Sequence, residues 1–107
     1  MSTTPKAEIL NLVEMVSYQP DSVVSRQITK ADAGNITLFA FDEGQGLSEH
    51  TAPFDALAHV LEGRAEIIIS GNSHRLKMGN AIIMPANEPH ALKADGPFKM
   101  LLTMIRN

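Results

Sequence analysis

Two stretches, GQGLSEHTAPFDALAHVLEG at residues 44–63 and GNAIIMPANEPH at residues 79–90, decide how this chain folds. Each begins at a glycine and holds short apolar runs between turn-forming residues, which is typical of β-strands joined by tight loops. Each also delivers one histidine, His50 from the first stretch and His90 from the second. Because transition-metal sites usually take three or four imidazole or carboxylate ligands, this pair looks like half of such a site.

Similar short runs continue on both sides of these stretches. The pair Gly71-Asn72 predicts a tight hairpin, with His74 near the turn and facing solvent. The only helix candidate is residues 7–15, whose apolar side chains fit one helical face loosely. About eight short strands predict a small all-β barrel or sandwich. The expected strands are residues 22–29, 35–41, 57–61, 65–70, 73–76, 81–84, 90–93 and 98–105.

Composition fits one folded domain. Of 107 residues, 44% are hydrophobic and 20% charged, and a chain of this length buries roughly 65% of its unfolded surface. The nine basic residues are spread along a chain of net charge −3, so no nucleic-acid partner is expected. No run is long enough to span a membrane or to act as a signal peptide, so we expect a cytoplasmic protein without a membrane partner. Without cysteines, histidine and carboxylate side chains must carry any chemistry.

The spacing of the two stretches is specific. Gly44, five residues, His50 and Gly63, followed after fifteen residues by Gly79 and then His90, resembles the two motifs of the cupin superfamily. The resemblance implies an all-β cupin or jelly-roll double-stranded β-barrel over residues 21–107, preceded by an N-terminal arm over residues 1–20. It also implies a homodimer, in which sheet edges or faces pair across a two-fold axis.

The match to metal-binding cupins is incomplete. Their first motif reads Gly, five residues, His-x-His, three or four residues, Glu, six residues, Gly, and their second motif supplies a further histidine. His50 matches the first histidine of this pattern and His90 the last, but the second histidine falls at Ala52 and the glutamate at Ala56. Two methyl groups therefore stand where the family places metal ligands.

A third ligand would have to come from nearby, and His59 is the main candidate. If Ala56 faces the barrel lumen, strand alternation sends His59 to the outer face, where it packs on the sheet or at a subunit interface. A β-bulge after Pro53 would shift the register by one residue and bring Asp55 and His59 inward together. Otherwise Asp55 lies in a turn and hydrogen-bonds to nearby backbone. Both registers remain open.

Two interpretations of the histidine pair also remain open. In one, His50, His90 and His59 hold a divalent transition metal such as Zn, Fe, Mn or Ni. In the other, His50 and His90 line a metal-free pocket as neutral imidazoles. In both cases the expected pocket is mostly apolar and suits a small organic ligand. The residues expected to line it are Ala52, Phe54, Asp55, Ala56 and Met84.

These interpretations lead to three functional hypotheses. The first is a small-molecule-binding cupin, with or without a divalent metal. The second is a metal-dependent dioxygenase or a related small-substrate enzyme, although the pair lacks the carboxylate of the two-histidine, one-carboxylate triad. The third is metal-free, epimerase-like chemistry with a histidine base and a tyrosine acid, but the single tyrosine, Tyr18, lies far upstream of both motifs. Whether the protein is an enzyme stays open.

Overall fold

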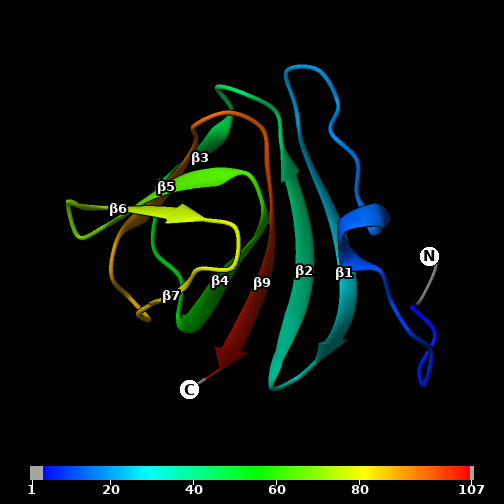
Figure 1. Ribbon diagram of the computed structural model, residues 1–107. Coiled ribbons are helices and arrows are strands. Elements are labelled where there is room, and N and C mark those ends of the chain that lie inside the picture. Colours follow the sequence, from blue (N-terminus) through cyan, green and yellow to red (C-terminus); the bar gives the residue numbers. More distant parts are fainter. Residues whose placement is uncertain (1–3, 107) are drawn as a thin grey trace.

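The computed structural model describes residues 4–106 and shows two antiparallel sheets packed face to face (Figure 1). One sheet has the strand order β1-β2-β9-β4-β7, and the other has the order β3-β8-β5-β6. The strands are β1 (Val23–Ala31), β2 (Gly34–Phe41), β3 (Gly46–His50), β4 (Phe54–Glu62), β5 (Arg64–Ile69), β6 (Asn72–Lys77), β7 (Ala81–Met84), β8 (His90–Ala94) and β9 (Phe98–Arg106). A single turn of 3₁₀-helix, η1 (Leu12–Met15), precedes them.

Alternating burial builds the core between the sheets. Strand β5 buries every second residue, with Ile67 fully buried, and β4 does the same with Ala56, Ala58 and Val60. The rings of Phe41 and Phe98 stack in this core with centroids 4.4 Å apart. Each fully buried side chain of this size contributes roughly 1.5–3 kcal/mol to stability.

The predicted all-β class is confirmed, and the architecture is that of a jelly roll. The sheets do not close into a barrel, because no hydrogen-bonded ladder joins them anywhere in residues 4–106. Of the two expected forms, a barrel or a sandwich, the structure is thus the two-sheet sandwich. Side-chain packing, rather than continuous strand pairing, holds the two layers together.

The predicted hairpin forms one residue earlier than expected. Ile69 pairs with Asn72, so the two turn residues are Ser70 and Gly71, with φ angles of 49° and 82°. Positive φ at both positions is the signature of a type I′ turn. His74 lies on β6 opposite the buried Ile67 and is half-buried, not fully exposed to solvent.

Strand β4 begins at Phe54, three residues before the predicted start, which places Asp55 in a strand and not in a turn. After Pro53 the ladder to β9 runs without a bulge up to Val60, and the register shift lies between Val60 and Glu62. Strand β3 was absent from the expected strands, and it carries a second irregularity between Leu47 and His50. The turn between β4 and β5, at Gly63, runs close to Pro97. A Cβ added to Gly63 would clash with the Pro97 carbonyl oxygen.

The helix predicted over residues 7–15 is wrong. Ala7 has φ 61°, a left-handed conformation that ends any helix there, and only η1 is helical. Leu12 and Met15 instead pack against a cluster on the outer face of the five-stranded sheet, whereas Ile9 is exposed. The buried members of this cluster are Val16, Leu38 and Ala40. Residues 12–18 thus form an arm against the outside of β1 and β2 (Figure 1).

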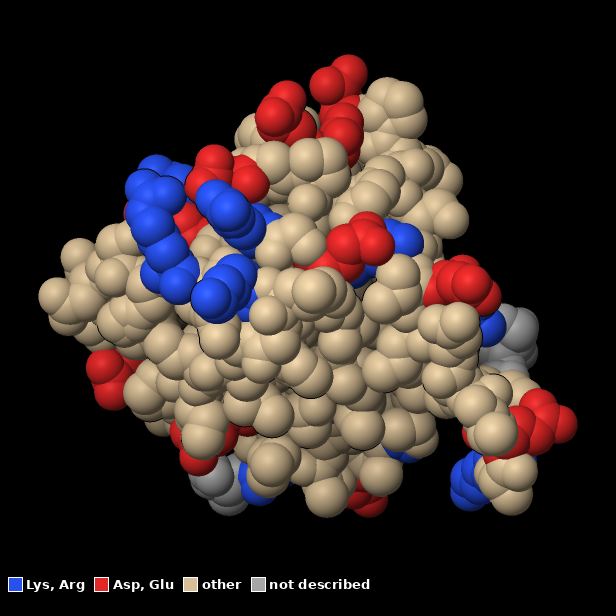
Figure 2. Space-filling model, viewed as in Figure 1, with Lys and Arg blue, Asp and Glu red and all other residues tan. Residues whose placement is uncertain are grey.

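No helix in the described part of the chain is long and apolar enough to cross a membrane. Charge is less evenly distributed than the sequence suggests. Lys and Arg side chains that are dispersed along the chain gather over β5 and β6, at the upper left of Figure 2, with acidic side chains beside them.

Candidate functional site

His50 and His90 meet on neighbouring strands. They are directly paired in the β3–β8 ladder, and their rings lie in an edge-to-face arrangement with centroids 4.3 Å apart. His90 also pairs with Ile69, whose side chain belongs to the core. The row of paired residues His50, His90 and Ile69 therefore faces the space between the sheets. His90 is 5% exposed and His50 is exposed, which places the pair at the edge of the core with one ring open to solvent.

The irregularity in β3 explains how His50 reaches this row. Leu47 pairs with Leu92 and packs against the core, while His50, three residues later, pairs with His90. Side chains three residues apart point to opposite faces of a regular strand. The extra residue of the bulge restores the inward direction of His50.

Backbone carbonyls orient both imidazoles in the same way. Nδ1 of His50 donates to the carbonyl of Ser48 at 2.7 Å, and Nδ1 of His90 donates to the carbonyl of Glu88 at 3.2 Å. A carbonyl oxygen only accepts, so in the neutral rings the proton sits on Nδ1 and Nε2 carries a lone pair. Both Nε2 atoms are therefore free to accept a hydrogen bond or to ligate a metal.

The loop that carries His90 is fixed at several points. The Asn87 N–H donates to the Ala52 carbonyl at 2.8 Å, and the Ala86 N–H donates to Oδ1 of Asp55 at 2.9 Å. The Ser70 hydroxyl donates to Glu88 at 2.8 Å, closing the loop against the β5–β6 turn. This bonding holds the first and second motifs together, so the position of His90 relative to His50 is preset.

Burial keeps His90 neutral. Desolvation lowers the pKa of His90 below its ordinary value, and the neighbouring His50 lowers it further, against an opposing effect of the bond to the Glu88 carbonyl. At neutral pH the ring is thus an unprotonated imidazole.

The structure separates His59 from this pair. Ala58 and Val60 face the core, so His59 lies on the opposite, outer face, paired with Ala81 and Leu101. This is the unbulged register considered from the sequence. Within residues 4–106 no group of three or more His, Cys, Asp or Glu side chains is placed to hold one metal ion.

The other expected pocket residues divide between two roles. Ala56 and Met84 pair across β4 and β7 and are buried in the core, and Phe54, two residues before Ala56, lies on the same side of β4 with Arg106 over its ring at 5.6 Å. Ala52 and Asp55 instead hold the β7–β8 loop through hydrogen bonds. Of the apolar lining expected from the sequence, Ala56 and Met84 are therefore core residues, and Phe54 lies on the same side of β4.

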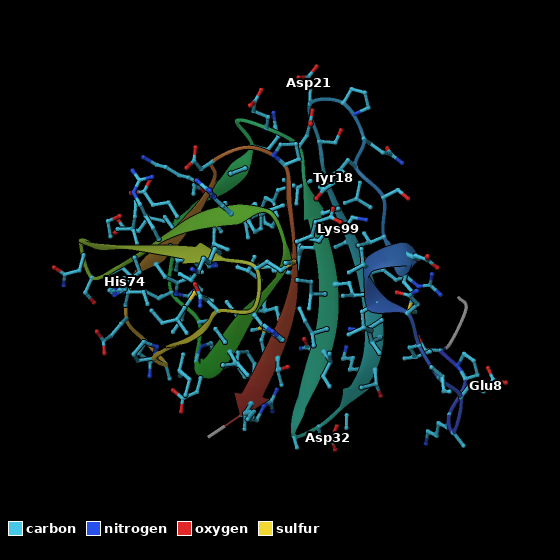
Figure 3. The ribbon with its side chains drawn as sticks, in the orientation of Figure 1. Glu8, Tyr18, Asp21, Asp32, His74 and Lys99 are labelled. Atoms are coloured by element: carbon cyan, nitrogen blue, oxygen red, sulfur yellow. The ribbon has the colours of Figure 1, made fainter. Side chains whose placement is uncertain are left out.

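A second group of polar side chains lies where the N-terminal arm meets the sheet. We call it the arm cluster, and it consists of Tyr18 from the arm, Glu62 from β4 and Lys99 from β9. The Tyr18 hydroxyl donates to Oε2 of Glu62 at 2.6 Å, and the Lys99 ammonium donates to the Val13 carbonyl at 2.6 Å. Lys99 also lies 5.1 Å from the Tyr18 ring centroid, and both side chains sit between the arm and the sheet in Figure 3. Burial, followed by the bond to Glu62, raises the pKa of Tyr18. Tyr18 is thus on the outer face, whereas His50 and His90 face inward.

Sequence reasoning did not find the groups that orient the pair. The carbonyls of Ser48 and Glu88 belong to the backbone, so no residue type marks them. Ser70, which fixes Glu88, lies on a different hairpin. Only the bulge in β3 could have been inferred, because an inward Leu47 and an inward His50 require one extra residue.

Comparison with known proteins agrees with this architecture. The model of the cupin domain family matches residues 37–105. A conserved protein of unknown function from Streptococcus pyogenes superimposes with a TM-score of 0.91 at 36% identity, covering 100% of this chain and 96% of that one. A cupin superfamily protein from Desulfitobacterium hafniense gives a TM-score of 0.91 at 27% identity, covering 99% and 97%.

A third similar structure, a cupin 2 conserved barrel domain protein from Leptotrichia buccalis, has 36% identity and a TM-score of 0.88. The match covers 91% of this chain and 47% of that one. A search of curated proteins finds no match. With the family model matching more than half of its length, this chain belongs to the cupin family.

Proposed function

We propose that this protein is a small-molecule-binding cupin whose ligand is held by His50 and His90. The observation that supports this most strongly is the shared orientation of the two rings, 4.3 Å apart and each bonded through Nδ1 to a backbone carbonyl. The bonding leaves two Nε2 lone pairs at the edge of an apolar core, and no side-chain partner for either is found among residues 4–106.

The tautomer specifies the chemistry of the ligand. A neutral imidazole whose Nδ1 proton is already donated offers only an acceptor at Nε2. The matching ligand is a small organic molecule that carries a hydrogen-bond donor, such as a hydroxyl or amine group. A ligand with acceptors alone would leave both lone pairs unpaired.

A divalent transition metal is the second candidate, because Nε2 atoms freed in this way are also the usual metal ligands. The donor set supplies two ligands, so it fits a metal only if water or ligand oxygens fill the remaining positions. A divalent ion bound there would act as a Lewis acid toward a ligand oxygen. The two-histidine, one-carboxylate set of a dioxygenase is not assembled in the described residues.

Thermal shift with matched variants tests both candidates. Wild-type protein, His50→Ala and His90→Ala would be screened with small diols, amino alcohols and hydroxy acids, and separately with Zn²⁺, Ni²⁺ and Mn²⁺. A ligand at about 100 times its Kd stabilises the protein by about 2.7 kcal/mol. We expect that stabilisation in the wild type and its loss in both variants. His59→Ala is the matched control, because this histidine lies on the other face of β4 and should leave binding unchanged.

Elemental analysis of protein purified without chelators separates the two candidates. A metal near full occupancy that disappears in both His50→Ala and His90→Ala favours the metal site. Stabilisation by an organic ligand in metal-free protein favours the metal-free pocket. Binding that survives in both variants would refute the proposed site.

We also propose that the protein is a homodimer. The outer face of β4, β7 and β9 leaves Leu57, Ile83 and Ile105 at 38%, 62% and 56% exposure, in contrast to the part covered by the arm. Light scattering after gel filtration should give twice the monomer mass for the wild type. The charged variant Ile83→Lys should shift the protein toward monomer, and a monomeric wild type would contradict the proposal.

A further inference from the structure

A basic cleft lies at the other end of β5 from the histidines. It has a volume of about 290 Å³, and Arg64, Arg75, Lys77, Asn80 and Asp95 contribute to its lining. His90 pairs with Ile69, the last residue of β5, whereas Arg64 is the first. At about 3.3 Å per residue the two places are about 16 Å apart along the strand, so the cleft is separate from the histidine pair.

The charges lining this cleft are unbalanced. Arg64 and Lys77 are directly opposite each other in the β5–β6 ladder, so their side chains leave the same face of the sheet. Asp95 is paired with Arg75, at 3.4 Å. Neither Arg64 nor Lys77 has a carboxylate within ion-pair distance in the part of the chain that the structure describes. Like charges directly opposite destabilise a ladder, and an anion between them would remove that cost.

Further basic side chains flank the cleft. Glu66 pairs with Arg75 on one side and Lys93 on the other. The pKa of Glu66 is lowered mainly by the hydrogen bond from the Ser73 hydroxyl, against an opposing effect of desolvation, and to a lesser extent by these two basic side chains. In Figure 2 this region carries a concentration of Lys and Arg, although the chain as a whole has a net charge of −3.

Asn80 adds a neutral donor. Its Oδ1 accepts the Lys77 backbone N–H at 3.0 Å, which leaves the side-chain NH₂ to donate. A guanidinium, an ammonium and an amide NH₂ are the donors that bind phosphate oxygens. The volume is at the lower end of ligand pockets, which favours a small molecule over a macromolecular polyanion. We infer that Arg64, Lys77 and Asn80 form a binding site for the phosphate group of a small molecule, either free phosphate or a phosphomonoester.

An NMR titration tests this inference. Uniformly ¹⁵N-labelled protein would be titrated with inorganic phosphate, and separately with glycerol 3-phosphate, with chloride holding the ionic strength constant. We expect saturable shifts of the amides in residues 64–65, 75–77 and 80. Tighter binding of glycerol 3-phosphate identifies a phosphomonoester site, and equal binding identifies a site for the phosphate group alone. A linear, unsaturated response, or shifts centred on His50 and His90, would overturn the inference.

Charge-matched variants make the test specific. Arg64→Gln/Lys77→Gln should weaken phosphate binding by about a hundredfold, since each charged donor accounts for about a factor of ten. Lys6→Gln/Lys30→Gln makes the same change in net charge elsewhere and should leave the affinity unchanged. Asp95→Asn removes the carboxylate that lines the cleft and should tighten phosphate binding about threefold. If both double variants lose affinity equally, the effect is general charge attraction and the site is refuted.

The loss of these charges should not unfold the protein. Removing one of two opposed like charges should leave the melting temperature unchanged or raise it. Should the double variant be poorly folded, Arg64→Gln and Lys77→Gln can be measured singly, each with about a tenfold loss expected. Wild-type affinity in both single variants would overturn the inference.

Discussion

The histidine pair and the arm cluster are both partly buried polar groups, but they differ in how completely their hydrogen-bonding capacity is used. In the arm cluster, Tyr18 donates to Glu62 and Lys99 donates to the Val13 carbonyl. In the pair, Nδ1 of each ring is bonded, while Nε2 has no partner side chain among residues 4–106. A polar group that is satisfied internally stabilises the fold, whereas one with unused capacity at a solvent-accessible edge is available to a ligand.

The two groups also face different parts of the molecule. A register shift in β4 places Glu62 opposite Lys99 under the arm, and one in β3 places His50 opposite His90 between the sheets. Each strand thus uses an irregularity to aim one polar side chain. The difference predicts that changes in the arm cluster act on stability and changes in the pair act on binding.

The largest effect is expected from completing the donor set. Ala52 lies two residues after His50, and its carbonyl is bonded to Asn87 in the loop that carries His90. Ala52→His should add a third imidazole and raise the affinity for Ni²⁺ or Zn²⁺ by about a hundredfold, because these ions prefer three or more protein ligands. Isothermal titration calorimetry with each ion would measure the change.

The matched control is Thr51→His, which adds the same ring one residue earlier, at an exposed position. Successive residues of an extended chain point to opposite sides, so this variant should leave the affinity near that of the wild type. Equal gains in the two variants would show that a surface histidine, and not completion of the pair, causes the effect.

Lys99→Ala should produce the next largest effect, a destabilisation of about 2 kcal/mol. The side chain is 11% exposed, and its loss removes the bond to Val13 and the positive charge near Glu62. Urea unfolding measures the change. Lys99→Met, which keeps the aliphatic stem, separates lost packing from lost hydrogen bonding. Stability within about 0.5 kcal/mol of the wild type would show that the arm is held by its apolar contacts alone.

Stability should depend on pH through His90. Its folded pKa is lowered by burial, so the unfolded chain binds a proton more readily. The contribution of His90 is therefore fully present above the unfolded pKa of about 6.5 and is lost as pH falls from there through the folded pKa. Urea unfolding between neutral and mildly acidic pH measures the slope. His90→Asn keeps a donor for the Glu88 carbonyl and should reduce the slope, and an unchanged slope would assign it to other groups.

The sequence predicted the parts of this molecule that depend on residue type and spacing. Alternating apolar residues predict β5 and most of β4, and the motif spacing predicts that His50 and His90 lie together. Alternation from Ala56 left two registers open for His59, and the unbulged ladder of β4 decides for the outward one. The helix predicted over residues 7–15 is wrong because Leu12 and Met15 pack on a sheet that only the tertiary fold supplies.

Other features had no local signal. The carbonyls that orient the imidazoles belong to the backbone, and the basic cleft brings Arg64 next to Lys77 through a ladder register. The choice between a barrel and a sandwich, which the sequence left open, likewise depends on strand pairing between distant segments. These features depend on the register between strands, which composition and spacing specify only weakly.

The smallest expected effect is on the stability of His50→Ala, and it tests the comparison most directly. The side chain is exposed, and its losses are one bond to the Ser48 carbonyl and the edge contact with His90. Urea unfolding should give a change of about 0.5 kcal/mol or less, since water replaces both interactions at the surface. The same variant should lose ligand binding, whereas Lys99→Ala should lose stability and keep binding at temperatures where it is folded. If His50→Ala instead destabilised the protein as much as Lys99→Ala, the pair would be a structural element of the β3–β8 ladder, and its unused Nε2 atoms would no longer argue for a ligand.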